Sequence, residues 1–228
     1  MQPTYLPWSG YFGLLNSVDL FIFLDSVQFE RRSWQQRNQI KIVNGSQWLT
    51  VPVNSKGKRD QKINEVEIDL NSRHYEKHQK SITLNYNKSL FFNNTSKAIF
   101  EIFEKNINNL SCLNIELINL LNNLLGIKTK TLKSSDLMSK GVKSNLLASI
   151  CSEVGAKEYI SPQGSKSYLD ISDAFDEIET KIHYFKYTHP RYSQNFDGFL
   201  ENMSVIDLLM NCGEESLELI QNSSEIVQ

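Results

Sequence analysis

The apolar residues of the chain change their spacing several times, and each change marks an expected element of structure. Residues 20–24 form a continuous apolar run between Asp19 and Asp25. Such a run is typical of a strand that is buried on both faces, as in a parallel sheet. A short helix is expected before it, at about 11–18, so the chain opens with an α/β pattern.

A hairpin is expected at about 37–53. Two β-prone segments there flank Asn44-Gly45, and this pair favours a type I′ turn, which needs positive φ angles at both central positions. The segment 62–70 also alternates between apolar and polar residues, which predicts another strand.

From residue 74 the apolar spacing becomes helical, and several helices are expected in a central block at roughly 73–126. Gly126 follows the last of them at the position typical of a helix C-terminus. Beyond it, the pattern predicts a strand at 127–132, a helix at 143–153 and a strand at 158–160. This βαβ-like unit favours parallel pairing.

A strand near 180–187 and a helix around 205–210 complete the pattern. We therefore expect an α/β fold with a mostly parallel, Rossmann-like sheet, an antiparallel hairpin and a central helical block. No internal repeat or linker divides the chain. Residues 1–228 are thus expected to form a single domain with a helical lobe at roughly 73–126.

The composition argues against several classes of protein. The 228 residues include 24 basic and 26 acidic side chains, a formal net charge of -2, so no bulk charge draws the chain to nucleic acid or to an anionic membrane. The three cysteines lack C-x-x-C spacing, which argues against a structural zinc site and indicates a reducing compartment. No apolar run approaches the roughly twenty residues of a membrane helix, and no signal-peptide pattern is found. A cytoplasmic location without a membrane span is expected.

The N-terminal segment is rich in proline and aromatic residues. Pro3 and Pro7 stiffen it, because proline locks φ and lacks an N–H donor. A stiff loop that carries the rings of Tyr5, Trp8 and Tyr11 suits a pocket that grips a polar ring at low entropic cost. The same rings would also suit a cap on the hydrophobic core, and the sequence leaves both roles open.

Ordered motifs run through the chain and carry a family resemblance. They are Gln2-Pro3-x-Tyr5-Leu6-Pro7-Trp8-x-Gly10-Tyr11-Phe12, Asp25-x-Val27-Gln28-Phe29, Arg32-x-Trp34-x-x-Arg37-Asn38, Trp48-Leu49-Thr50-Val51-Pro52-Val53, Tyr168-Leu169-Asp170, Pro190-x-Tyr192-x-Gln194 and Ser204-x-Ile206-Asp207-Leu208-Leu209. In content and order they resemble the WbqC-like family of bacterial proteins over nearly the whole chain. Members usually carry a few more apolar residues before the Gln-Pro pair, forming a first strand, whereas here only Met1 precedes it.

The resemblance implies a role in the synthesis of bacterial surface polysaccharides. The family is associated with gene clusters for O-antigen and other surface polysaccharides, and its members are suspected of adding acyl or aminoacyl groups to amino sugars. The implied function is that of an acyltransferase-like enzyme. Its implied partners are a nucleotide-linked amino sugar and an activated acyl or aminoacyl donor, and no cofactor is indicated.

Asp25 is the candidate catalytic residue. It directly follows the apolar run at 20–24, and ligands of open α/β sheets bind beyond the carboxyl ends of the strands. There it would orient or deprotonate an amine. An Asp at the end of a strand also commonly caps a turn, and the sequence leaves these two roles open.

The candidate substrate-binding residues come from the same motifs. Arginine forms bidentate hydrogen bonds with phosphate or carboxylate, and the alternative for the arginines is a solvated face of the hairpin. Loops rich in polar groups supply the C-terminal members of the set. The set consists of Gln2, Tyr5, Trp8, Gly10, Tyr11, Gln28, Arg32, Arg37, Asn38, Tyr168, Tyr192 and Gln194.

Two other functions remain open. The N-terminal pattern faintly resembles nucleotidyl-transferring ligases that carry His-x-Gly-His, but the matching stretch, Trp8-Ser9-Gly10-Tyr11, has no histidine. A non-catalytic sugar-binding assembly factor is the third hypothesis, because no recognised catalytic constellation is found.

The remaining polar candidates are expected to be structural. His74 and His78 do not fit His-Glu-x-x-His spacing, so they are expected to be surface histidines that bind no metal. Asp207, which lies inside an apolar run, is expected to hold a neighbouring motif in place.

Overall fold

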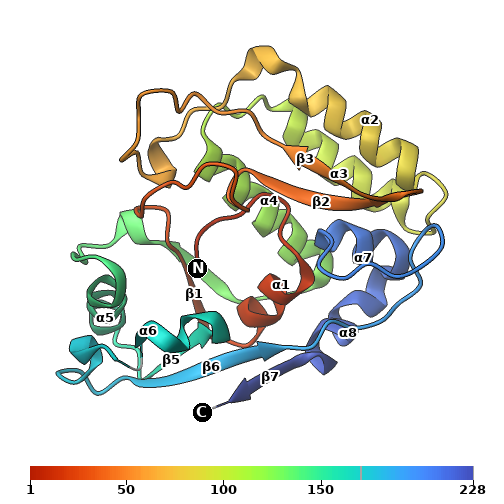
Figure 1. The fold of residues 1–228 in the computed structure, drawn as a ribbon. Helices are drawn as coiled ribbons and strands as arrows, with labels where there is room; N and C mark the ends of the chain where they lie inside the picture. Colours follow the sequence, from red (N-terminus) through yellow and green to blue (C-terminus); the bar gives the residue numbers. More distant parts are fainter. Residues whose placement is uncertain (170, 228) are drawn as a thin grey trace.

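A computed structural model describes residues 1–169 and 171–227, apart from the side chain of Tyr168 (Figure 1). The strands pair in separate small sheets. They are β1 (Leu20–Phe23) parallel with β4 (Lys130–Lys133), β2 (Arg37–Ile42) antiparallel with β3 (Gly45–Thr50), and β5 (Glu158–Pro162) with β6 (Lys181–Tyr187) and β7 (Ser224–Val227). The mixed α/β class is therefore confirmed. The described strands do not join into the single, mostly parallel sheet that was expected, because β1–β4 and β5–β6 stay in different sheets.

The predicted hairpin is confirmed, but its turn differs from the one expected. β2 and β3 pair from Arg37 opposite Thr50 to Ile42 opposite Gly45, so Val43 and Asn44 occupy the turn. Neither of these two has a positive φ, whereas Gly45 has a φ of 117°. A type I′ turn is thus excluded, and Gly45 instead takes the fourth turn position, where type I turns favour glycine.

The central helical block is confirmed, and the strand predicted at 62–70 is not. The block consists of α2 (His74–Tyr86), α3 (Phe92–Glu104) and α4 (Leu110–Leu125), and Gly126 ends it with a φ of 80°. In place of the strand the chain forms two short 3₁₀ turns, η1 (Ile63–Glu65) and η2 (Leu70–Ser72). Ile63 and Val66 are both fully buried, and their spacing of three residues suits the period of a 3₁₀ turn.

The other helices surround the sheets. They are α1 (Ser9–Asn16), α5 (Lys143–Glu153), α6 (Lys166–Leu169), α7 (Val205–Cys212) and α8 (Ser216–Asn222), with short 3₁₀ turns η3 (Ser134–Asp136), η4 (Gln163–Ser165), η5 (Asp173–Phe175) and η6 (Gly213–Glu215). In Figure 1, α1 lies above the β5–β6–β7 sheet, and the β2–β3 hairpin lies next to α2. Across the described part of the chain, no helix combines the length and apolar content that crossing a membrane requires.

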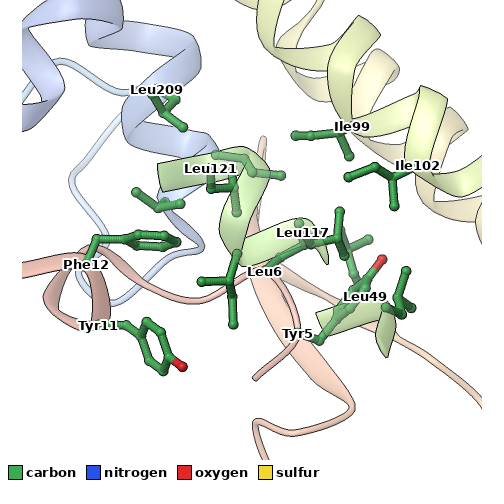
Figure 2. Packing of buried hydrophobic residues seen from close by; sticks show 14 of the residues in the cluster. Tyr5, Leu6, Tyr11, Phe12, Leu49, Ile99, Ile102, Leu117, Leu121 and Leu209 are labelled. Carbon is green, nitrogen blue, oxygen red and sulfur yellow. The ribbon is translucent and has the colours of Figure 1, made fainter. Parts of the chain in front are cut away.

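Two hydrophobic clusters make up the core. In the larger one, Figure 2 shows Leu6 and Phe12 of the N-terminal region turned toward Leu117 and Leu121 of α4. The smaller one packs α5 against η5 and the β5–β6 sheet. Strand β6 joins them, because its neighbouring residues Tyr184 and Phe185 belong to the smaller and the larger cluster respectively.

Candidate functional site

The N-terminal loop is held by side-chain amides from other elements. Asn114 Nδ2 on α4 donates to the carbonyl oxygens of Pro3, at 3.1 Å, and Gln35, at 2.7 Å. Asn38 Nδ2 on β2 donates to the carbonyl of Leu6 at 2.7 Å. These bonds satisfy backbone acceptors that proline-containing irregular structure leaves without a helical or sheet partner. The loop is therefore fixed by tertiary contacts in addition to its prolines.

The aromatic residues of this loop divide between the two roles that the sequence left open. Tyr5 is fully buried in the larger cluster, and its hydroxyl lies 2.8 Å from His78 Nδ1. Trp8 lines a cavity, and Tyr11, which is 1% exposed, belongs to the same cluster as Tyr5 and also lines that cavity. The hydroxyl of Tyr11 donates to the carbonyl of Gln2 at 3.2 Å, which ties the first residues of the loop to α1. The loop thus serves both as a core cap and as a cavity wall.

The cavity has a volume of about 1050 Å³ and lies between the two hydrophobic clusters. One wall is the N-terminal loop with α1 and β1, and the opposite wall is α5 with β5. Its lining includes the aromatic residues Trp8, Tyr11, Trp34 and Tyr159 and the amide residues Gln2, Gln35 and Asn38. A concave site with aromatic rings and a few polar groups is the usual form of a small-molecule site.

The charged side chains around the cavity are mostly acidic. Asp19, Glu30 and Glu158 contribute three carboxylates to its lining, and all three residues are exposed to solvent. Among the described lining residues, Lys157 has the only cationic side chain. This balance favours a ligand that places a positively charged or hydrogen-bond-donating group, such as an amine, at the solvent-exposed part of the cavity.

Asp25 lies at the carboxyl end of β1, as expected, but its carboxylate is turned to the segment after β4. One oxygen accepts hydrogen bonds from Ser134 Oγ at 3.0 Å and from the backbone N–H of Ser135 at 2.9 Å. The other oxygen accepts from Ser135 Oγ at 2.7 Å. Asp25 is only 2% exposed and is not among the residues that line the cavity. Its contacts therefore stabilise the turn η3 against the end of β1.

Gly10 supports the cavity wall through its lack of a side chain. A Cβ at this position would lie 2.6 Å from two atoms of the Trp8 indole, a distance that forces the ring to move. Trp8 lies edge-on to Tyr187, with 5.2 Å between the ring centroids. Gly10 thus lets the indole pack over the start of α1, where it lines the cavity.

The predicted residues of the C-terminal motif form a buried network around Asp207. Asp207 Oδ1 accepts from the hydroxyl of Tyr86, and Oδ2 accepts from the hydroxyl of Tyr192 and from Gln194 Nε2, all at 2.7–2.8 Å. Burial raises the pKa of the Asp207 carboxyl above its ordinary value. Lys41, itself 2% exposed, donates to the carbonyls of Phe196 and Gly198. The network fastens the loop before α7 to the hairpin and α2.

Comparison with known proteins supports the family suggested by the motifs. The sequence profile of the WbqC-like protein family matches residues 2–219. The chain belongs to this family. It is also 37% identical over 223 residues to the uncharacterized protein Rv1507c of Mycobacterium tuberculosis, and the match covers 97% of this chain and 96% of that protein. No solved structure matches the chain.

The cavity brings together only some of the site residues predicted for this WbqC-like chain. Gln2, Trp8, Tyr11 and Asn38 line it. The predicted residues outside its lining, all with described side chains or backbone, are Tyr5, Gly10, Asp25, Gln28, Arg32, Arg37, Tyr192 and Gln194. The side chain of Tyr168 lies outside the described part of the structure. The binding roles of these residues remain predictions.

The hairpin and loop members of the predicted set lie at the surface or close to it. Gln28 is exposed, and its Nε2 donates to the carbonyl of Arg59 at 3.2 Å. Arg32 is exposed and has a φ of 59°. The guanidinium carbon of Arg37 lies 4.2 Å from the centroid of the Trp48 ring. The exposure of Gln28 and Arg32 agrees with a solvated face, whereas Arg37 is half-buried and its Nε is shielded from solvent.

Several residues of the site were missed from the sequence. Glu30, Trp34 and Gln35 line the cavity, and Asn114 holds two segments of its wall. Trp34 was part of a quoted motif and could have been found there. Asn114 gave no signal, because a single asparagine within an apolar helix is common in a chain so rich in this residue.

The cysteine in the cavity lining is not an activated nucleophile. Cys151 lines the cavity, and burial raises the pKa of its thiol to about 11, so the thiol stays protonated near neutral pH and is a weak nucleophile. Within the described residues, no group of three His, Cys, Asp or Glu side chains has a geometry that could hold a metal ion.

The expectation that His74 and His78 are surface residues was wrong. They are only 2% and 5% exposed. Burial lowers the pKa of His74 to about 4 and that of His78 to about 3. Both side chains therefore stay neutral near pH 7 and act as part of the core.

Proposed function

We propose that this WbqC-like protein is an enzyme of bacterial surface polysaccharide biosynthesis that transfers an acyl or aminoacyl group to the amino group of a nucleotide-linked amino sugar. The observation that carries the proposal is the cavity of about 1050 Å³ with aromatic rings on its walls and three carboxylates in its lining. Rings of tryptophan and tyrosine pack against sugar faces while their polar atoms stay available for hydrogen bonds. The carboxylates favour a ligand with an amine.

In the proposed reaction the sugar amine attacks the carbonyl carbon of the activated donor. The new C–N bond forms as the bond to the donor's leaving group breaks, and the amine gives up a proton. We propose that the Glu30 carboxylate accepts this proton, because Glu30 is one of the three acidic residues in the cavity lining. The hydrogen bond from its backbone N–H to Gln35 Oε1, at 3.0 Å, only fixes its main chain beside that lining residue. Such proton transfer typically contributes about 10²–10⁴-fold to the rate.

The catalytic role predicted for Asp25 is less well supported than that of Glu30. Three hydrogen bonds from Ser134 and Ser135 occupy its carboxylate, and the cavity lining does not include it. We therefore propose that Asp25 is a positioning residue, which fixes the end of β1 beside the cavity.

The test is a transfer assay with the purified full chain. Nucleotide-linked amino sugars with a free amine are incubated with acyl-coenzyme A, acylated acyl carrier protein or aminoacyl donors. The mass of the sugar product is then measured by mass spectrometry. The expected product has gained one acyl group without consumption of ATP. Glu30→Gln should lower turnover by about 100-fold or more, whereas Glu101→Gln, which changes an exposed residue on α3, should leave it unchanged.

The same assay separates the two other hypotheses. A product that forms only with ATP would favour the ligase. The non-catalytic sugar-binding factor is favoured by one observation, which is that neither Asp25 nor Cys151 offers an activated group to the cavity. Thermal stabilisation by amino sugars without any product would support that alternative.

A further inference from the structure

Two exposed tryptophans and an arginine lie close together at one end of the β2–β3 hairpin, with Trp34 in the segment just before β2. Trp34 is 46% and Trp48 is 40% exposed. Their ring centroids lie 5.3 Å apart with 45° between the ring planes, and the Arg37 guanidinium lies 4.2 Å from the Trp48 centroid. We call these three residues the tryptophan corner. So much indole surface is costly to leave in water, which marks the corner as a candidate binding surface.

The hairpin register explains why this corner points outward. Arg37 pairs with Thr50, and Gln39 pairs with Trp48, so Arg37 and Trp48 are diagonal neighbours on one face. Asn38, Ile40 and Leu49 occupy the other face and are at most 1% exposed. Further along the same outer face, Lys41 is buried under the loop at 196–198. At the end that carries Arg37 and Trp48, packing of the core uses the inner face and does not account for the aromatic outer face.

Arg37 retains unused hydrogen-bonding capacity. Within the described residues its Nε is buried without a hydrogen-bond partner, and none of the ion pairs includes its guanidinium. Because this Nε is shielded from solvent, a ligand can reach Arg37 only through the exposed part of its half-buried side chain. Arg31 and Arg32, both exposed, lie shortly before Trp34 in the chain. The surroundings of the corner therefore favour an anion.

Trp34 connects the corner to the cavity, because it is exposed and also belongs to the cavity lining. Arginines lie near the corner, whereas carboxylates line the cavity. A ligand that fits both regions has a flat ring and a phosphate outside and an amine inside. Indole faces stack on nucleobases, and guanidinium groups bind phosphate in a bidentate manner.

We propose that the tryptophan corner is the nucleotide subsite, in which Trp34 and Trp48 stack on the base of a nucleoside diphosphate and Arg37 binds its phosphate. This assignment rests on the proposed function only for the sugar that continues from the phosphate into the cavity. It changes the roles predicted from the sequence, because Trp34 and Trp48, and not the rings of the N-terminal loop, receive the base.

The test is to titrate the full chain with UDP and with GDP and to measure binding by calorimetry and by tryptophan fluorescence. At least one of the two should bind and quench the fluorescence. Trp48→Ala should weaken its binding by about tenfold or more, and this variant is the cleanest because Trp48 does not line the cavity. Val43→Ala is the matched control, since Val43 is an exposed apolar residue of the same hairpin, and it should bind as the wild type does.

The contribution of Arg37 is tested separately with the nucleoside alone. Arg37→Ala should weaken the binding of the diphosphate much more than that of the matching nucleoside. Because Trp48→Ala could fail to fold, a second variant, Trp8→Phe, leaves Trp34 and Trp48 as the only tryptophans of the chain. Its fluorescence should still be quenched by the nucleotide.

Four results would overturn the subsite: no binding of either diphosphate at millimolar concentration, equal affinity of wild type and Trp48→Ala, loss of quenching in Trp8→Phe, or binding of a disaccharide such as chitobiose at the corner in place of a nucleotide. Failure of the proposed function looks different. If nucleotide binding depends on Trp48 but no acyl transfer is found, the proposed subsite is supported and the proposed reaction is refuted. If acyl transfer occurs and Trp48→Ala leaves its KM unchanged, the proposed reaction is supported and the proposed subsite is refuted.

Discussion

Asn114 Nδ2 lies 2.7 Å from the carbonyl oxygen of Gln35, and the same amide reaches the carbonyl of Pro3 at 3.1 Å. One fully buried side chain on α4 thus joins the N-terminal loop to the segment that carries Trp34. Both segments line the cavity. The shape of the cavity therefore depends on a residue that does not line it.

Replacement of Asn114 should destabilise the protein and loosen the cavity. Asn114→Leu keeps the branched shape of the side chain but leaves two buried carbonyls without a donor, which should cost about 2–5 kcal/mol of unfolding free energy. Urea unfolding measures the loss. Asn122→Leu is the control on the same helix, because Asn122 is also buried and its Oδ1, like that of Asn114, has no partner among the described residues, but its side chain does not hold the N-terminal loop to the Gln35 segment. Equal losses in the two variants would refute the role assigned to Asn114.

Replacement of Gly10 should displace Trp8. In Gly10→Ala the new Cβ would come within 2.6 Å of the indole, and the resulting rearrangement should cost about 1–3 kcal/mol. The fluorescence of Trp8 should shift, since the ring must leave its packing against Tyr187. Gly164→Ala is the control, because a Cβ there meets nothing within 4 Å. An unchanged spectrum for Gly10→Ala would contradict the packing described.

The buried histidines of α2 should make the protein sensitive to acid. Burial lowers the pKa of His74 to about 4 and of His78 to about 3, whereas histidine in an unfolded chain titrates near pH 6.5. The unfolded chain therefore binds more protons than the native protein below about pH 6.5, and stability falls as the pH drops from there toward 4. The pair should cost about 2–4 kcal/mol at pH 5.

Urea unfolding at several pH values checks this expectation. The double variant His74→Gln/His78→Gln lacks both titrating rings, so its stability should depend less on pH between 6.5 and 4 than that of the wild type. Above pH 7 the two proteins should show parallel pH profiles. Identical acid profiles over the lower range would show that the acid sensitivity has another source.

The sequence predicted local elements better than their assembly. Period and turn residues located β2, β3, α5 and the helices of the central block, because these depend on neighbours in the chain. The pairing of strands depends on contacts such as those of β1 with β4, more than a hundred residues apart, and no local pattern specifies whether two such pairs share one sheet. This is why three small sheets replaced the expected one.

The candidate site was predictable in the same uneven way. Trp8 and Tyr11 line the cavity as expected, but Tyr5, from the same loop, turns into the core. An irregular loop has no fixed spacing between residues that point the same way, so the sequence could not predict which rings point into the core and which line the cavity. His78 was misplaced for a related reason, because Tyr5 contacts it from a loop some seventy residues earlier in the chain, and His74 packs against His78 in turn.

Loss of the Asp207 carboxylate should destabilise the protein strongly. Asp207→Ala leaves the hydroxyls of Tyr86 and Tyr192 and the amide of Gln194 without their acceptor. Several buried unsatisfied donors should cost about 3–5 kcal/mol, measured by urea unfolding. Asp197→Ala, which changes an exposed residue of the neighbouring loop, should cost less than about 0.5 kcal/mol. The assignment fails if the two variants are equally stable.

Two substitutions at Asp25 should separate its structural role from the catalytic role that the sequence suggested. In Asp25→Asn the remaining oxygen can still accept from Ser134 and from the backbone of Ser135, so stability should change by less than about 1 kcal/mol, whereas Asp25→Ala should lose about 2–3 kcal/mol. Because an amide cannot take up a proton at neutral pH, the asparagine variant tests general base catalysis directly. If Asp25 only positions the end of β1, Asp25→Asn should retain turnover within a few-fold of the wild type, and a fall of about 100-fold with unchanged stability would restore Asp25 as the base.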